Sequence, residues 1–133
     1  MIDIEAKVYT PIANALRAQF AGIDVTPEPT NSPAAFPHVD MVETDNYASP
    51  DRQTNGDAET FATVTYDVNV YSNKQGLRKY QCRQIIKFID DMMFAANFTR
   101  IALTGYPDLE HNTIYRMTAR YRAETDGKTL YRR

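Results

Sequence analysis

The sequence predicts an α+β fold: a single mixed, mostly antiparallel sheet with two helices packed on one face and a long β-hairpin loop. Three observations support this prediction. Residues 61–71 alternate apolar and polar side chains, which is the period of a half-buried strand. Residues 77–96 then carry apolar side chains at steps of three, four and five, as one face of a helix does. Residues 1–20 repeat that helical spacing, and a length of 133 residues suits one domain, 1–133.

The central strand and the helix after it form the unit around which the chain packs. We expect the even positions of the strand to meet the helix, and the odd positions to be wet or to meet a partner. Ser72 and Asn73 are candidate caps for the helix. Cys82, Ile86 and Met93 lie beside its main apolar stripe, so a second helix or another subunit should cover the excess. The predicted stripe holds Leu77, Tyr80, Ile85, Phe88, Ile89, Met92 and Ala96.

The N-terminal half begins with a helix that Asp3 can cap and Gly22 ends. Pro11 interrupts this helix, yet the apolar spacing passes through it without a change of phase, which predicts one kinked helix. Three segments follow: a short strand at 23–26, an extended connection with four prolines at 27–37, and a strand at 38–44.

Residues 45–59 are predicted to form a long flexible loop. The segment is polar and contains few large apolar side chains, so it cannot bury enough surface to offset the entropy of its own ordering. Connections of this length are commonly functional or disordered. We therefore expect the segment to order on a partner.

Three more strands complete the sheet. Gly105 and Pro107 break the first of them, and the Asp126–Gly127 pair is a strong signal for a two-residue hairpin turn before the last. Such a turn places Ala123 opposite Leu130. The predicted strands lie at 98–103, 113–124 and 129–132.

Composition and motifs give no sign of catalysis, metal, cofactor or membrane. No apolar run approaches the roughly 20 residues that span a bilayer, and the N-terminus lacks signal-peptide features, so we expect a cytoplasmic origin. His38 and His111 lack the partners of a zinc site, and Asp90 and Asp91 diverge on a helix. Cys82 is interpreted as a small buried hydrophobe. We expect no enzyme.

Charge is divided unevenly along the chain. Residues 1–59 hold three Lys/Arg against ten Asp/Glu, and residues 60–133 hold twelve against seven, giving −7 and +5. These are either two solvated faces or surfaces of opposite sign that meet on neighbouring copies, as in a head-to-tail ring. The late arginines share one strand face and could meet Asp67 and Asn69 if the two strands are neighbours. The candidate subunit-interface residues are Asp67, Asn69, Ile86, Met93, Arg116, Arg120 and Arg122.

The order of these parts resembles the tail terminator and tail completion (head–tail joining) proteins of long-tailed bacteriophages. The resemblance covers nearly the whole chain and rests on arrangement, because that family has no catalytic signature to match. The motifs that carry it are an N-terminal helix, Phe36-Pro37-His38-Val39 at the start of a strand, the acidic loop, the strand Val64–Tyr71, the second helix, and the closing strand Ile114–Tyr121.

This resemblance implies a structural virion protein of the tail-neck region, assembled in the host bacterial cytoplasm. It would form a homo-oligomeric ring, a hexamer, that caps the tail tube, ends its polymerisation and joins the head. Its partners would be the tail tube protein and a head-completion or connector protein, while genomic DNA passes through the lumen unread. The alternatives are a head-side neck protein of the same virion, or a small DNA-binding module that uses the arginine face. The loop residues that would contact tail or head are Asp45, Asp51, Arg52, Asp57 and Glu59.

Overall fold

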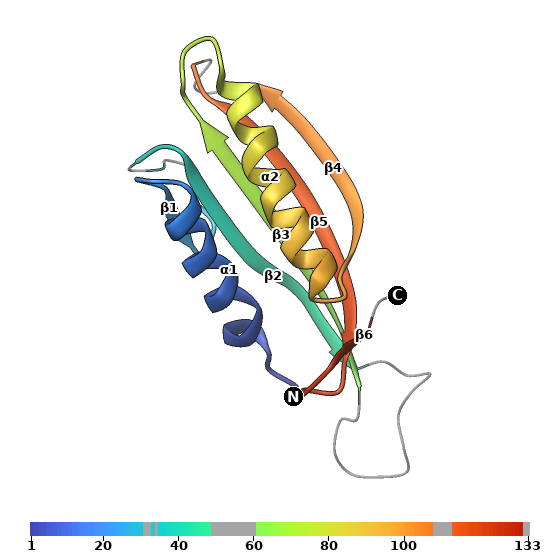
Figure 1. The fold of residues 1–133 in the computed structure, drawn as a ribbon. Coiled ribbons are helices and arrows are strands. Elements are labelled where there is room, and N and C mark those ends of the chain that lie inside the picture. Colours follow the sequence, from blue (N-terminus) through green and yellow to red (C-terminus); the bar gives the residue numbers. More distant parts are fainter. Residues whose placement is uncertain (31–32, 34, 49–60, 108–112, 132–133) are drawn as a thin grey trace.

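The computed structural model describes residues 1–30, 33, 35–48, 61–107 and 113–131. It has the predicted α+β architecture, with two helices over a six-stranded mixed sheet that does not close into a barrel (Figure 1). The elements in chain order are α1 (Glu5–Gln19), β1 (Asp24–Thr26), β2 (His38–Ala48), β3 (Ala62–Ser72), α2 (Arg78–Ala95), β4 (Thr99–Pro107), β5 (Tyr115–Thr125) and β6 (Leu130–Tyr131).

The sheet runs in the order β1-β2-β3-β5-β4, and β6 also pairs with β5. Only β1 and β2 are parallel; the other pairs are antiparallel. Strand β3 lies in the middle and pairs with β5 from Ala62 opposite Thr125 to Ser72 opposite Tyr115. The first third of the chain therefore builds one side of the sheet, and the residues after β3 build the other.

The core lies between the sheet and the two helices, as the alternation of β3 predicted. All six even positions of β3 are buried, and Leu16 from α1 and Ile85 and Ile89 from α2 pack against that face. Each fully buried side chain of this size contributes roughly 1.5–3 kcal/mol. Phe20 and Phe88 meet edge to face at 5.6 Å and join the two helices.

Helix α1 is continuous through Pro11, as predicted. Pro11 and Lys7, four residues earlier, are both exposed. The carbonyl that loses its helical hydrogen bond to proline can therefore be hydrated. The Asp3 carboxylate accepts the Glu5 N–H at 3.2 Å, although the residue at the cap position is Ile4.

The predicted start of α2 was wrong, and its predicted apolar stripe was only partly right. The helix begins at Arg78, after a turn at Gly76 (φ 78°), so Ser72 and Asn73 do not cap it. The Ser72 hydroxyl instead accepts the Lys74 N–H and bonds the Gln81 side chain. The buried stripe is rotated from the predicted one and consists of Cys82, Ile85, Ile86, Ile89 and Met93.

Ile86 and Met93 were therefore predicted wrongly as surplus surface for another subunit. They are 3% and 0% exposed and belong to the subunit's own core. Leu77 and Tyr80, expected in the core, are 47% and 59% exposed. A tertiary contact decided the phase, because apolar side chains lie on more than one face of this helix.

Two strands are longer than predicted. Strand β2 continues to Ala48 across a β-bulge between Glu43 and Asp45, so Asp45 is an exposed strand residue and not part of a loop. The remaining loop candidates Asp51, Arg52, Asp57 and Glu59 lie outside the described residues. Strand β4 continues through Gly105 to Pro107, which is tolerated because β4 is an edge strand.

The last hairpin has a different register from the predicted one. Thr125 pairs with Leu130, so the loop holds four residues, and Ala123 is not opposite Leu130. The Asp126 carboxylate accepts the N–H groups of Lys128 and Thr129 at 2.9 and 2.8 Å and closes this longer turn. Gly127 adopts the left-handed conformation that the turn signal predicted, with φ 95°.

Candidate functional site

The sheet face without helices carries the predicted arginine cluster, but it is far drier than expected. Thr63, Thr65 and Asn69 at odd positions of β3 are all buried. The Tyr71 hydroxyl donates to the Thr30 carbonyl at 3.2 Å, which brings the proline-rich connection against this strand. The expectation that this face is wet or meets a partner is therefore wrong for most of β3.

Asn69 is the hub of a hydrogen-bond network on this face. Its side-chain amide donates to Asp40 at 2.6 Å. Its carbonyl oxygen accepts from the Arg116 guanidinium at 3.2 and 2.9 Å and from the Thr118 hydroxyl at 2.7 Å. The Arg116 guanidinium also lies over the rings of Tyr71 and Tyr106, at 5.6 and 5.9 Å from their centroids.

The network continues to β1 through a buried acid and a buried histidine. Asp40 is 0% exposed, and burial raises the pKa of its carboxyl, against the hydrogen bond from Asn69 and the nearby charges of His38 and Arg116. The His38 Nδ1 atom lies 2.9 Å from Asp24, and its Nε2 atom lies 4.0 Å from Asp40. Strand β1 pairs alongside His38, with Asp24 directly opposite it.

The remaining arginines behave differently from one another. Arg120 makes a two-pronged ion pair with Asp67 at 2.7 and 3.1 Å. The Arg122 Nε atom is buried and has no hydrogen-bond partner among the described residues. The prediction that this strand face meets Asp67 and Asn69 is confirmed. The use of this arginine face as a free basic surface is not supported, because Arg116 and Arg120 are already bonded within the subunit.

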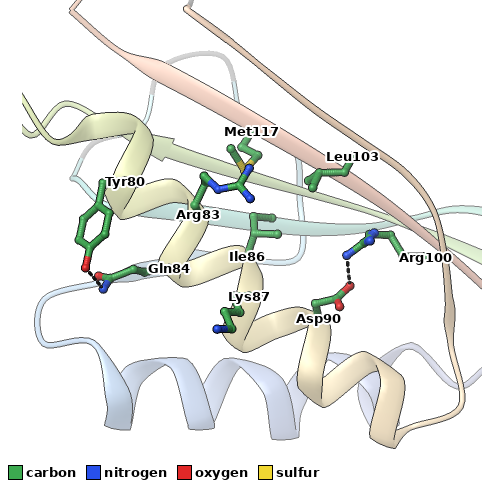
Figure 2. A pocket seen from close by; sticks show the side chains of 9 residues that line it. All are labelled: Tyr80, Arg83, Gln84, Ile86, Lys87, Asp90, Arg100, Leu103 and Met117. Carbon is green, nitrogen blue, oxygen red and sulfur yellow. Dashed lines mark hydrogen bonds and ion pairs between the residues drawn. The ribbon is translucent and has the colours of Figure 1, made fainter.

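A groove of about 500 Å³ lies between α2 and β4. Figure 2 shows Arg83 and Ile86 of α2 pointing toward Met117 and Leu103 of the sheet, with Arg100 of β4 beside Asp90; Lys87 also lines the groove. Ile86, predicted as an interface residue, lies in its floor. The groove is thus cationic at the rim and apolar beneath.

An ion-pair chain closes one end of the groove. Arg100 bonds Asp90 at 3.1 Å, and Asp90 also accepts the Tyr121 hydroxyl at 3.0 Å. Burial raises the pKa of that hydroxyl, as does the charge of Asp90, so Tyr121 remains a donor. Asp90 therefore holds α2 against β4 and β5.

The exposed side of α2 and the turn that precedes it are strongly basic. This basic surface was not predicted from the sequence. Residues 74–87 contain five Lys/Arg and no Asp/Glu. This run was visible in the sequence, but the predicted apolar stripe placed Leu77 and Tyr80 inward. We define the α2–β4 surface as Leu77, Arg78, Lys79, Tyr80, Arg83, Lys87, Phe94, Ile101 and Leu103.

The other end of the sheet, formed by β1 and β2 together with α1, is acidic. Residues 1–48 hold seven Asp/Glu and two Lys/Arg. Burial raises the pKa of Glu43, and the charges of Glu5 and Asp3 raise it further, against the hydrogen bond from Tyr66. These three carboxylates therefore lie close enough to repel one another. We define the acidic side as Asp3, Glu5, Glu28, Glu43 and Asp45.

Cys82 is a core residue whose thiol is not placed to react. It is fully buried, its thiol lies 3.5 Å from the Val70 carbonyl, and burial raises the pKa of the thiol to about 12. Across the ranges that the structure describes, no three His, Cys, Asp or Glu side chains gather to hold a metal ion. No helix in those ranges is both long and apolar enough to cross a membrane.

Comparison with known proteins assigns no family: the chain matches no protein-family model, and no curated protein matches it.

Proposed function

We propose that this chain is a structural virion protein that forms a ring on the phage tail tube, ends the tube's polymerisation and provides the head–tail joining surface. Support comes from the order of its elements, which resembles that of tail terminator and tail completion proteins. The ring is a hexamer of identical chains in the tail-neck region, and it contacts the tail tube protein and a head-completion protein. DNA passes through its lumen without being read.

One observation carries the proposal: surfaces of opposite charge lie at opposite ends of the strand order of a single sheet. The acidic side is built by α1, β1 and β2, and the basic α2–β4 surface lies over the other end of the strand order (Figure 1). A head-to-tail contact uses two different patches of each subunit, and it closes into a ring when the rotation allows. A symmetric dimer could pair the two patches only if a single interface held both of them, and they lie at opposite ends of the strand order.

The arginine face gives the competing DNA-binding function little support. Arg116 is held by Asn69 and two tyrosines, and Arg120 by Asp67, so neither charge is free for phosphate. A head-side neck protein would use the same ring and differ only in the particle end that it binds.

Electron microscopy of the purified protein, alone and mixed with growing tail tubes, tests the function. We expect rings at one end of each tube, and tubes that stop lengthening once the protein is added. Rings that bind isolated heads and leave tube growth unchanged would place the protein on the head side. Protein that neither forms rings nor binds either particle would refute the proposal.

A further inference from the structure

We propose that the α2–β4 surface is the docking site for a second copy of this chain, which brings its acidic side to it. This inference rests on the proposed ring and names the two surfaces that build it. It also replaces the arginine face of β5 as the basic partner in subunit contact.

The distribution of exposed apolar side chains points to this surface as an interface. Nine large apolar side chains are exposed in the described part of the chain. Five of them belong to the α2–β4 surface, including Tyr80 (59%) and Phe94 (61%). Single exposed apolar residues are ordinary, but a gathered set rimmed by polar side chains is typical of protein–protein contacts.

The groove supplies the recess and the charge that such a contact needs. Lys79, Arg83 and Lys87 have no ion-pair partner among the described residues, and Figure 2 shows Arg83 beside the apolar side chains of Ile86 and Met117. Strand β4 is the last in the sheet order, so one of its backbone edges faces away from β5. Aromatic and arginine side chains around an apolar recess are the usual anchors of an interface.

Charge complementarity identifies the occupant as another copy. The acidic side holds Asp3, Glu5 and Glu43 close together, without an ion pair among the described residues. It lies with α1 and β2 at one end of the sheet, and β4 lies at the other (Figure 1). The two surfaces therefore cannot meet within one chain, whereas they can meet between neighbours.

Paired charge reversals in the full chain test the contact. The basic variant is Arg83→Glu with Lys87→Glu, and the acidic variant is Asp3→Lys with Glu5→Lys. Sedimentation velocity over a range of protein and salt concentrations should show each variant associating about tenfold more weakly than the parent. This magnitude is expected because each variant reverses two charges, and each exposed ion pair contributes only modestly. Combining the two variants should restore most of the association, because the charges are again opposite.

Matched controls separate this contact from a general effect of charge. Lys128→Glu makes the same kind of reversal at an exposed position outside both defined surfaces, and it should associate as the parent does. Tyr80→Ala removes an exposed anchor without changing charge, and it should weaken association while the melting temperature stays within about 2 °C of the parent, as exposed substitutions do.

Four results would overturn the inference. The first is association of the basic and acidic variants equal to that of the parent, and the second is a combined variant that associates no better than either alone. Rings still seen on tail tubes would then preserve the proposed function and reject only these surfaces. A parent that remains monomeric at every concentration and leaves tubes uncapped would reject both. Duplex DNA binding that the basic variant abolishes, with self-association intact, would assign the groove to nucleic acid.

Discussion

Replacing Asn69 with alanine should destabilise the fold more than any other change to the helix-free sheet face. Asn69 is 6% exposed and bonds Asp40, Arg116 and Thr118 through four contacts of 2.6–3.2 Å. The substitution leaves the buried Asp40 carboxylate with one donor fewer, at a cost of about 3 kcal/mol for hydrogen bonds to charged groups. In a domain of this size we expect the melting temperature to fall by roughly 10 °C.

The pH dependence gives that prediction a second, independent readout. Burial raises the pKa of Asp40 above its ordinary 3.8, so its contribution to stability is complete below that value and is lost as pH rises through the folded pKa. The Asn69 hydrogen bond lowers that pKa, because it favours the carboxylate. The stability deficit of Asn69→Ala should therefore be smaller at about pH 4 than at about pH 8.

Thermal melts at both pH values, monitored by circular dichroism, measure this deficit. Asp67→Ala on the same strand is the control, because its partner Arg120 is 51% exposed and such pairs contribute about 0–1 kcal/mol. Equal melting temperatures for the Asn69 and Asp67 variants, or a deficit independent of pH, would refute the reasoning.

Three further outcomes are expected. Val68→Asp places a charge in the core and should abolish cooperative melting, whereas Thr65→Ala on the opposite face should stay folded; similar melts would contradict the facing of β3. Cys82, whose pKa burial raises to about 12, should react with a disulfide reagent only after unfolding, and a fast reaction in the native protein would disprove its burial. The pKa of Asp126, lowered by the N–H groups of Thr129 and Lys128, should lie below 3.8 in an NMR titration; a value at or above 3.8 would argue against this turn.

Local periodicity was enough to predict the central unit of the fold. The alternation in β3 and β5 fixed both strands and their core faces, because a period of two has one interpretation on a sheet. The phase of α2 was not predictable in this way. Its apolar residues occupy more than one helical face, so only the packing against β3 and β5 decided that Ile86 turns inward and Tyr80 outward.

The burial of the polar network could not be predicted from the sequence for a similar reason. Threonine, aspartate and asparagine at alternate positions are equally consistent with a wet face. Their burial depends on β3 being central and on the chain near Thr30 approaching Tyr71, and both are long-range facts. The strand alternation therefore told which side chains share a face, but not whether water reaches that face.

The same network explains why the subunit's charges divide into two groups. Asp40 lies directly opposite Asn69, Asn69 opposite Thr118, and Asp67 opposite Arg120. A slip of one residue in either pairing would turn these polar groups toward the helices and bury them in the apolar core. These side chains thus hold β2, β3 and β5 in register, and that register sets the acidic side and the α2–β4 surface at opposite ends of the sheet. Because Asp67 and Arg120 are matched within the subunit, the charge left for contact between subunits is the charge on the helix side.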